Sequence, residues 1–475
     1  MSDHAKPTTA DLKSDPDRFW DLSVTEVYSI PLEEVHEIQR AALANRFADL
    51  VERIPMVKKL ADGNGVTRIT EIEDGAALLF QHSIYKSYPM SYLENNRFDK
   101  LTQWLDKLTT FDLSGLDASE IDTIDDWIDF IDTNSPIRIR HSSGTSGKLS
   151  FLPGGPTDYS RGLQGWQDYF CGFGNEPDAD VSGFETMPVI FPSYRKGAMH
   201  QHRLLDKMVE TMFGGDESMV VTLNPGRMSA DALSLGGRLS AAESKGELGE
   251  FKLSPKLIER RDAFLAARDR AAEDSRIFFA AMADRFKGQR VAVLGSIGQI
   301  FDIAEVGAAS GHMNVFAPES LIMMGGGMKG RVLPSDWYKT VTNFLGVTGL
   351  RDGFGMTELV AATRSCPAGY YHLPPAYIPY ILSIETGEPL PRTGEQTGRL
   401  GVYDLTRTEM WGGFLTGDKV TIRWGDTNPC SCGRVGPHLT KDISRVGAAD
   451  GGDDKITCAG APAAHDRALD FLSTL

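Results

Sequence analysis

Apolar positions along the chain follow two patterns, and the order of these patterns predicts the fold class. Apolar residues three and four positions apart over 33–54 and 98–111 predict amphipathic helices, and the charged stretch 254–274 predicts an exposed helix. Short apolar runs that are typical of buried strands follow, namely MPVIF (187–191), SMVVTL (218–223), VAVLG (291–295) and LIMMG (321–325). Strands that alternate with helices indicate an α/β fold with largely parallel sheets flanked by helices.

The same pattern divides the chain into parts. Residues 1–30 are expected to form an N-terminal arm and residues 31–445 the main domain. After residue 400 the chain changes to short strand-like pieces and turns, such as WGGFLTGDKVTIRWGD, which predict a β-rich section. The Gly/Asp-rich AADGGDD (448–454) predicts a linker or turn, so residues 446–475 are expected to form a short tail.

Composition and charge narrow the class of function. Of 475 residues, 41% are hydrophobic, and the formal net charge of −16 disfavours general nucleic-acid binding. No run of about 18 apolar residues predicts a membrane span, and the polar N-terminus lacks the apolar core of a signal peptide. We therefore expect a cytoplasmic protein, in which the odd count of five cysteines argues against a disulfide framework.

The first stretch with a chemical signature is SSGTSGK (142–148), which combines hydroxyl groups, glycines and one lysine. It is not a P-loop, because the pattern G-x-x-x-x-G-K-[ST] fails at its first and last positions, where the chain has Ser142 and Leu149. Two interpretations of the composition remain. It forms either a surface turn or a flexible loop whose N–H groups, hydroxyls and Lys148 surround a phosphate group.

A second glycine motif, GGGMKG (325–330), matches the dinucleotide pattern G-x-G-x-x-G, and Asp352 follows at a suitable distance. In a dinucleotide-binding fold the helix starts inside the motif. Here Pro334 and Ser335 indicate a later helix start, so the sequence argues against a dinucleotide site.

Three segments in order resemble the nucleotide-binding motifs of the adenylate-forming superfamily: SSGTSGK (142–148), DGFGMTEL (352–359) and LTGDKV (415–420). KSYPMSYL (86–93), GGGMK (325–329) and CSCGR (430–434) resemble its branch of phenylacetate–CoA ligases and bioluminescence acyl-protein synthetases. The resemblance covers roughly residues 30 to 460. It implies the large N-terminal domain of an adenylate-forming enzyme, with parallel sheets, a β-rich subdomain and a strongly truncated C-terminal domain.

The resemblance also implies how ATP and its product AMP would be bound. Ser143, Thr145 and Lys148 would contact the β- and γ-phosphates, and Gly325 to Gly327 would lie against the adenine. The full set of implied nucleotide-binding residues is Ser142, Ser143, Thr145, Ser146, Lys148, Gly325, Gly326, Gly327, Phe354, Gly355, Met356, Thr357, Asp418 and Arg445.

The later motifs carry the remaining implied roles. Phe354, where the family usually has tyrosine, would stack on the adenine, Thr357 would touch the α-phosphate, and Glu358 would hold Mg²⁺. Asp418 would accept hydrogen bonds from both ribose hydroxyls. Arg445 is a looser match to the arginine at the hinge between the two domains of that family. In the implied reaction a substrate carboxylate attacks the α-phosphate of ATP, so the protein must position the groups and neutralise anionic charge. Lys148, Thr357 and Glu358 are therefore the expected catalytic residues of adenylation.

Four cysteine and histidine side chains predict a structural zinc site. Cys366 and His372 form C-x5-H, and Cys430 and Cys432 form C-x-C about 60 residues later. Two such pairs can close a tetrahedral Zn²⁺ site, and relatives in the phenylacetate ligase branch carry metal at matching residues. His438 is the alternative histidine ligand, and four reduced side chains without metal are the alternative interpretation.

The last cysteine leaves the acyl acceptor open. The implied acyl adenylate is captured by a thiol, and in acyl-protein synthetases a cysteine near the chain end, here Cys458, receives the acyl group. Cys458 is otherwise a small buried apolar residue. A thiol of a partner reductase or carrier protein, or CoA bound under a shortened lid, are the other acceptors. A nucleotide- and zinc-binding regulatory protein without turnover is the hypothesis from another class.

The carboxylic acid substrate is not readable from the sequence. Its pocket is expected in the segment that matches the family least, including SYRKGAMHQH (193–202). Arg195, Lys196, His200 and His202 there either face an anionic or polar substrate or belong to a solvated loop. The oligomeric state also stays open, with a homodimer as one option.

Overall fold

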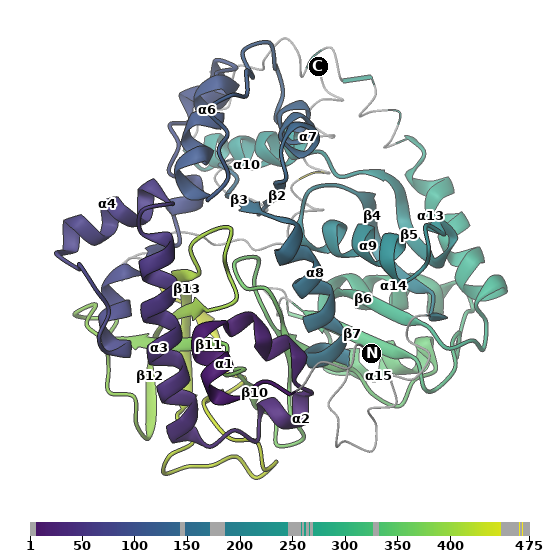
Figure 1. Ribbon diagram of the computed structural model, residues 1–475. Helices are drawn as coiled ribbons and strands as arrows, with labels where there is room; N and C mark the ends of the chain where they lie inside the picture. The colour runs from purple at the N-terminus through teal and green to yellow at the C-terminus, as the bar shows by residue number, and fades with distance from the viewer. Residues whose placement is uncertain are drawn as a thin grey trace.

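The computed structural model arranges the chain around two β-sheets, one mostly parallel and one mixed (Figure 1). The parallel sheet lies among helices on one side of the molecule, and the mixed sheet lies behind α3 (Leu32–Leu50) on the other. The structure describes residues 6–142, 148–171, 186–245, 258, 261–262, 266, 269–325, 332–447, 465 and 468.

The parallel sheet has the strand order β5-β4-β6-β7-β8-β9, in which only β9 runs antiparallel to its neighbour. All four apolar runs that predict strands form it, so the prediction of an α/β fold is confirmed. The bounds of its strands are β4 (Val189–Lys196), β5 (Val220–Arg227), β6 (Ala292–Ser296), β7 (Leu321–Gly325), β8 (Arg351–Phe354) and β9 (Thr363–Arg364).

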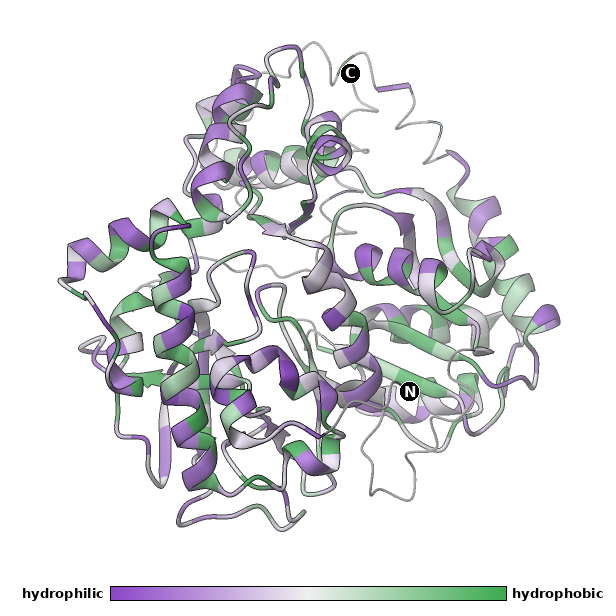
Figure 2. Cartoon of the chain, viewed as in Figure 1, coloured by the Kyte–Doolittle hydropathy of each residue, from purple (hydrophilic) through white to green (hydrophobic). Residues whose placement is uncertain are grey.

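Both faces of this sheet are buried, which explains why its strands are continuously apolar. Val189 and Phe191 pack on one face with α9 (His200–Thr211), whereas Ile190 packs on the other face with α14 (Ile297–Ala309) and α15 (Trp337–Leu345). Figure 2 shows the hydrophobic strands β6 and β7 between helices that are polar on their outer sides. The two faces therefore form separate apolar clusters.

The mixed sheet forms the predicted β-rich section. Its order is β10-β14-β13-β12-β11, and β1 and β15 also pair with β13. The long apolar strands of this sheet pack on α3, where Gln39 donates hydrogen bonds to the Pro375 and Tyr377 carbonyls. The bounds are β1 (Phe80–Gln81), β10 (Tyr371–His372), β11 (Tyr377–Leu382), β12 (Glu395–Asp404), β13 (Gly413–Arg423), β14 (His438–Leu439) and β15 (Ser444–Arg445).

The N-terminal residues from Lys6 onwards, expected as an arm, are folded against the mixed sheet. Leu12, Phe19 and Tyr28 belong to the same buried cluster as its strands. The Tyr28 hydroxyl donates a 3.0 Å hydrogen bond to the His372 carbonyl in β10. The segment contains α1 (Thr9–Ser14), η1 (Pro16–Asp21) and α2 (Val24–Val27).

The predicted amphipathic helices appear as α3 and as α6 (Phe98–Leu105), which continues into η4 (Asp106–Leu108). Most of the predicted helix 254–274 lies outside the described residues, and α13 (Ala271–Ala280) includes its end. The other elements are α4 (Pro55–Asn64), η2 (Ile72–Leu78), η3 (Ile84–Lys86), α5 (Ser91–Glu94), α7 (Ile124–Asn134), β2 (Arg138–His141), β3 (Phe151–Gly154), α8 (Pro156–Gly165), η5 (Trp166–Cys171), η7 (Glu217–Met219), α10 (Ala230–Lys245) and η9 (Ala281–Arg285).

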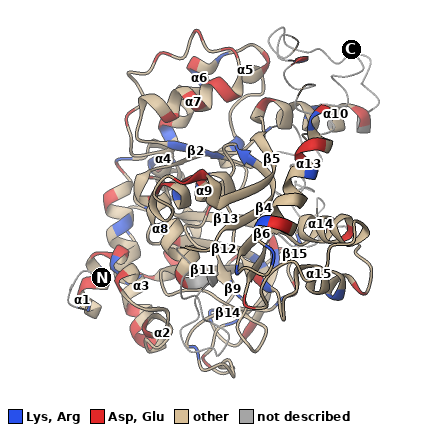
Figure 3. Ribbon diagram, turned by 90° about the vertical axis from the view of Figure 1, so that its right-hand side faces the viewer, with Lys and Arg blue, Asp and Glu red and all other residues tan. Residues whose placement is uncertain are grey.

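The surface reflects the acidic composition. Asp and Glu residues are spread over the helices near the N-terminus and around α7, whereas Lys and Arg gather near β2 (Figure 3). Within the described ranges, no helix combines the length and the apolar character needed to cross a membrane.

Candidate active site and metal centre

The predicted phosphate loop connects the two strands of the β2–β3 hairpin. Its described ends are fastened together, because Ser142 N donates to Ser150 O at 3.1 Å and Ser150 N donates to the Ser142 hydroxyl at 3.2 Å. Ser143, Thr145 and Ser146 lie outside the described residues. The hairpin therefore fixes where the loop leaves and re-enters the body of the protein.

Lys148, at the exit of this loop, lies against an aromatic ring. Its ammonium nitrogen is 4.9 Å from the centre of the Tyr88 ring, and the Tyr88 hydroxyl donates to Leu149 O at 2.8 Å. Partial burial and the nearby positive charge of Lys86 both lower the pKa of Lys148. Two cations thus lie near the loop exit, an arrangement that favours an anionic ligand.

The GFGMTE motif forms β8 and the turn that follows it. Two hydrogen bonds attach the turn to the mixed sheet: Val360 N donates to the Asp404 carboxylate at 2.9 Å, and Ala361 N donates to the Tyr377 hydroxyl at 2.7 Å. Phe354 is buried, with its ring centre 6.0 Å from that of Tyr371. This anchoring gives the turn a fixed place at the junction of the two sheets.

Neighbouring residues of the turn differ in exposure. Thr357 is buried, and Met356 packs partly buried against the main core cluster. Gly355 is exposed but has no room for a side chain, because a Cβ there would lie 2.5 Å from that of Ala362. A glycine is therefore required for the close approach of the turn to β9.

Glu358 is the charged residue of this turn. Desolvation raises the pKa of its carboxyl and nearby Asp418 adds to this, while Arg140 and Arg445 act in the opposite direction. A bound cation stabilises the charged form of a desolvated carboxylate, so Glu358 fits the expected Mg²⁺ ligand. The electrostatic contact also brings Glu358 close to the TGD motif.

Asp418 of that motif lies in β13 directly opposite Arg445 of β15. Arg445 Nε is 3.3 Å from Asp418 Oδ1, and a Cβ on Gly417 would lie 2.6 Å from Arg445 Nη1. The guanidinium group therefore lies against the backbone of the strand at Gly417. Three of the expected site residues, Glu358, Asp418 and Arg445, therefore lie in one electrostatic group.

Gly325 ends β7 beside Ser296, the last residue of β6. Among the residues that the structure describes, no atom would lie within 4 Å of a Cβ on Gly325. Gly326 and Gly327 lie outside the described residues. The next described helix, α15, begins at Trp337, which agrees with the late helix start that argues against a dinucleotide site.

The four predicted zinc ligands come together. The ligand atoms of Cys366, His372, Cys430 and Cys432 all lie within 4.8 Å of one another. Cys366 and Cys430 have their sulfur atoms 3.8 Å apart, and Cys432 Sγ is 3.3 Å from His372 Nε2. A hydrogen bond from Cys432 lowers the pKa of Cys366 to about 3, so one proton is shared within the pair.

These distances fit a tetrahedral zinc site. With ordinary zinc–sulfur and zinc–nitrogen bond lengths, two thiolates lie about 3.8 Å apart, and a thiolate and an imidazole nitrogen about 3.6 Å apart. Three sulfurs and one nitrogen form a donor set typical of closed structural sites. His438 is not a member of the group, because its ring stacks on His372 at 5.0 Å and its Nδ1 faces Gly436 O at 3.2 Å.

Other candidate residues have different partners. Asp352, considered for a dinucleotide site, accepts a 2.8 Å hydrogen bond from the Tyr371 hydroxyl and pairs with Lys441 at 2.8 Å. Arg195 and Lys196 form ion pairs with Asp206 and Glu217 at the end of β4. Residues 193–196 end β4 and residues 200–202 begin α9, while the connection at 197–199 is largely buried, so the segment is not a solvated loop.

The two histidines of that segment are buried. Desolvation lowers the pKa of His200 and of His202 to about 3, which keeps both rings neutral. Cys458 lies outside the described residues. His465, from the same tail, is buried, and its Nδ1 is 3.2 Å from the hydroxyl of Tyr194 in β4.

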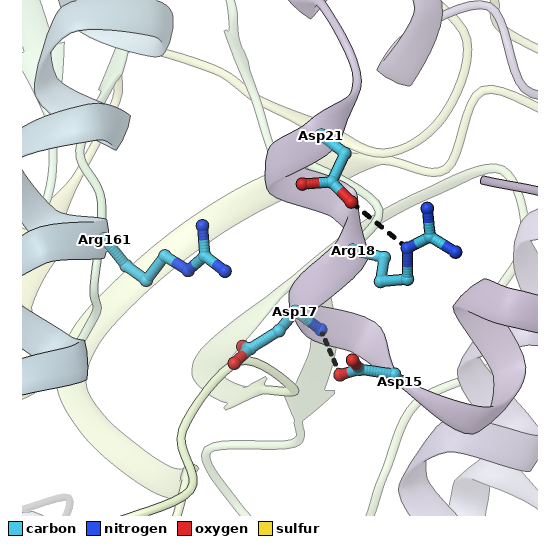
Figure 4. A pocket seen from close by; sticks show the side chains of 5 residues that line it. All are labelled: Asp15, Asp17, Arg18, Asp21 and Arg161. Carbon is cyan, nitrogen blue, oxygen red and sulfur yellow. Dashed lines mark hydrogen bonds and ion pairs between the residues drawn. The ribbon is translucent and has the colours of Figure 1, made fainter. Parts of the chain in front are cut away.

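A surface pocket lies elsewhere, between η1 and α8. It has a volume of about 470 Å³ and is lined by Asp15, Asp17, Arg18, Asp21 and Arg161 (Figure 4). Desolvation raises the pKa of Asp17 to about 6, and Arg161 opposes this shift. None of the expected nucleotide-binding residues lines this pocket.

The sequence reasoning missed three charged residues beneath the turn: Arg140, Asp158 and Arg407. All three are at least 98% buried, and Arg407 donates to the Glu358 carbonyl at 3.0 Å. Arg140 stands beside the glycine-rich loop in the sequence, which is a weak signal. Nothing in the spacing of Asp158 and Arg407 indicates that they meet.

No protein-family model matches the sequence, and no curated protein matches it. Solved structures do match. An open conformation of 2-hydroxyisobutyryl-CoA ligase with 2-HIB-AMP and CoA aligns at a TM-score of 0.48 and 14% identity, over 88% of this chain and 70% of that one. ATP-bound MatB from Rhodopseudomonas palustris aligns at 0.33 and 15%, over 64% of this chain and 46% of that one.

The luciferase-like enzyme from the mealworm Zophobas morio aligns at a TM-score of 0.32 and 12% identity, over 65% of this chain and 56% of that one. The chain thus spans about half the length of MatB and of the luciferase-like enzyme. The solved structures with which the chain aligns are therefore a CoA ligase, MatB and a luciferase-like enzyme.

Proposed function

We propose that this protein is an ATP-dependent carboxylate-activating enzyme that forms an acyl adenylate and passes the acyl group to a thiol. The observation that carries the proposal is the electrostatic group of Glu358, Asp418 and Arg445. Glu358 and Asp418 come from two segments about 60 residues apart that resemble nucleotide-binding motifs, and Arg445, from a third segment, pairs with Asp418 and acts electrostatically on Glu358. The two cations Lys86 and Lys148 near the third motif supply the charge that a triphosphate needs.

In the proposed reaction a carboxylate oxygen of the substrate attacks the α-phosphorus of ATP, and pyrophosphate leaves. Lys148 neutralises the phosphate oxygens and Thr357 orients the α-phosphate, while Asp418 accepts the ribose hydroxyls. Glu358 would hold Mg²⁺, which when bound neutralises charge on the leaving pyrophosphate. The acyl adenylate then reacts with a thiolate at its acyl carbon, and AMP leaves as the thioester forms.

Our preferred acceptor is a protein thiol, either Cys458 or a thiol on a partner reductase or carrier protein. His465 contacts Tyr194 in β4 near the carboxyl end of the parallel sheet, where ligands bind in open α/β sheets. Cys458 precedes His465 by seven residues, a length that spans at most about 25 Å. This reach supports Cys458 as an acceptor within the same chain. CoA is the alternative acceptor.

Exchange of labelled pyrophosphate into ATP tests the adenylation step. We expect exchange with at least one member of a panel of aliphatic, aromatic and hydroxy carboxylic acids. The variant Glu358→Gln should lower the exchange rate by about 10²–10³-fold, because it removes the charge that holds the metal. Absence of exchange with every acid would refute the proposal and favour a nucleotide-binding protein without turnover.

The acceptor is tested on the protein itself. After incubation with ATP and a labelled acid, we expect label on the denatured chain that hydroxylamine releases, as it does from a thioester. Cys458→Ala should abolish this label and leave pyrophosphate exchange intact. Label that survives in Cys458→Ala would exclude this cysteine. Exchange without protein labelling, followed by consumption of added CoA, would establish CoA as the acceptor.

A further inference from the structure

Three buried charged side chains lie beneath the turn that carries Glu358. We call Arg140, Asp158 and Arg407 the arginine clasp. Their exposed fractions are 1%, 2% and 0%. Arg140 and Asp158 come from β2 and α8, on either side of the β2–β3 hairpin loop, and Arg407 comes from the distant segment after β12. The clasp therefore joins three separate elements at one point of the core.

Arg407 makes the central contacts of the clasp. Its Nη1 forms an ion pair with Asp158 Oδ2, and its Nη2 donates a 3.0 Å hydrogen bond to the backbone carbonyl of Glu358. One planar guanidinium thus ties the Glu358 turn to α8. A guanidinium can do this because its donors point in fixed, divergent directions, whereas a lysine ammonium is a single point charge.

The same carboxylate extends the clasp to the phosphate loop. Arg140 Nη2 lies 3.5 Å from Asp158 Oδ2, and Arg140 precedes Ser142 by two residues in the strand that leads into the loop. Helix α8, which carries Asp158, begins two residues after β3, the strand that follows the loop. Both flanks of the phosphate loop are therefore coupled to the turn through one carboxylate.

Two glycines let the backbone approach the clasp and its neighbour Glu409 closely. A Cβ on Gly154 would lie 3.0 Å from Arg140 Nη2, and a Cβ on Gly155 would lie 2.2 Å from the Glu409 carboxylate, which accepts a hydrogen bond from Asp158 N. Such a buried ionic cluster costs desolvation energy that its own attraction only partly recovers. Its contribution lies in fixing geometry rather than in stabilising the core.

We propose that Arg407 is a positioning residue for adenylation, which holds the Glu358 turn in register with the described flanks of the phosphate loop, β2 and α8, through Asp158. The inference rests on the proposed function, because it assigns the turn and the loop to the same nucleotide. Beyond the proposed function, the inference states that the buried ion pair of Arg407 and Asp158 sets the distance between the turn and the flanks of the loop, in addition to any effect of the nucleotide.

The test compares Arg407→Lys with Arg392→Lys. Arg392 is the matched control, since its guanidinium is also largely buried and donates to a backbone carbonyl, that of Pro379, on the far side of the mixed sheet. Two readouts are measured on the full chain. They are hydrogen–deuterium exchange of the peptide 355–362, and the Mg²⁺ concentration that gives half-maximal pyrophosphate exchange.

We expect Arg407→Lys to raise the exchange rate of the 355–362 amides and the half-maximal Mg²⁺ concentration about tenfold each, and Arg392→Lys to change neither. Asp158→Asn should raise the amide exchange of 355–362 similarly, although Asp158 itself contacts Arg407 and not that turn. Unchanged values in Arg407→Lys, alongside a melting temperature lowered as in Arg392→Lys, would reduce the clasp to a purely structural element and overturn the inference.

The two readouts separate this inference from the proposed function. Wild-type protein that exchanges no pyrophosphate with any acid refutes the adenylation reaction. The amide-exchange comparison would then still decide whether Arg407 and Asp158 hold the turn. If the protein exchanges pyrophosphate but neither Arg407→Lys nor Asp158→Asn changes the amide exchange rate of 355–362, the proposed function stands and the positioning role is refuted.

Discussion

Two buried polar clusters attach to the same segment of chain, and they are built in opposite ways. The Cys/His cluster fastens residues 366–372 to the loop at 430–432, and the arginine clasp fastens Glu358 to α8. The cluster consists of three sulfur donors and one imidazole, all of which can be neutral. The clasp consists of charged groups, in which two guanidinium groups share one carboxylate.

This difference decides what each cluster needs. The three thiols and one imidazole of the Cys/His cluster are donors that a metal ion would complete, and under the zinc hypothesis the bound ion would stabilise this part of the fold. The clasp contains its own counter-charge, and removing Asp158 would leave two buried guanidinium groups without it. Metal removal and single charge deletions should therefore separate the two clusters.

The largest effect is expected from loss of the metal. Cys430→Ser should abolish zinc binding and lower the free energy of unfolding by on the order of 5 kcal/mol, because a structural metal contributes directly to folding. Metal analysis of the wild-type protein should give close to one zinc per chain. Differential scanning calorimetry should show that a strong chelator lowers the wild-type melting temperature toward that of the variant.

A matched control for this comparison is Cys366→Ser in the presence of the same chelator. If the metal is responsible, chelation should not lower the melting temperature of either variant any further. Wild-type protein that is purified without zinc and keeps its melting temperature in chelator would contradict the structural zinc site.

The next largest effect is expected from Asp158→Asn. Removing this charge leaves Arg140 and Arg407 buried together, and we expect a loss of about 3–5 kcal/mol in the free energy of unfolding measured with urea. Asp129→Asn is the control, because it breaks an ion pair with Arg227 in which Asp129 is 56% exposed and should cost less than about 1 kcal/mol. Equal losses in the two variants would contradict the clasp as a tightly coupled buried unit.

The contrast also explains what the sequence could predict. The candidate zinc ligands lie in two local pairs, 366/372 and 430/432, so their spacing alone predicts that they can bind a metal together. The strands of the parallel sheet were predictable for a similar reason, because burial on both faces produces continuous apolar runs such as LIMM. In both cases the signal is contained within a few residues.

The clasp could not be predicted, because its charges lie at positions 140, 158 and 407 and only the topology brings them together. The same holds for Arg195 and Lys196, which the sequence offered as substrate contacts. Their partners Asp206 and Glu217 lie on α9 and just before β5, and ion pairing with them was not visible in the segment 193–202. The sequence pattern around a charged residue does not indicate which distant residue it will pair with.

A buried pair of carboxyl groups, Asp125 and Asp231, shows how burial raises a pKa although Arg227 Nε lies 3.5 Å from Asp125 Oδ1. Asp231 accepts hydrogen bonds from Ile124 N and Asp125 N at 2.9 Å, and Ser229 donates to the Asp125 carboxylate. Desolvation, together with the adjacent Asp125, raises the pKa of Asp231 to about 8. Asp125 and Asp231 thus cap the helices α10 and α7 reciprocally, with a proton between them.

The sign of the pH effect follows from this raised pKa. The folded state retains the proton of Asp231 up to about pH 8, whereas the unfolded chain loses it near pH 4, so stability falls as pH rises between these values. We expect a loss of about 2 kcal/mol between pH 6 and 7.5 in wild-type protein. In urea titrations at pH 6 and pH 7.5, Asp231→Asn should remove this loss of unfolding free energy. A wild-type stability that rises over this range, with no difference in the variant, would contradict the shared proton.

The smallest effect concerns which histidine binds the metal. His372 and His438 stack on each other with ring centres 5.0 Å apart, and both are fully buried, so burial alone does not distinguish them. Only His372 directs a ring nitrogen at the sulfur atoms, while His438 Nδ1 faces Gly436 O. His438→Phe keeps the stacked ring and removes one hydrogen bond, so it should cost about 1 kcal/mol and leave the zinc content unchanged. His372→Phe removes a ligand and should lower the zinc content as Cys430→Ser does. The reverse result, with zinc lost in His438→Phe and kept in His372→Phe, would assign the fourth ligand to His438 and require β10 and β14 to exchange roles at the metal.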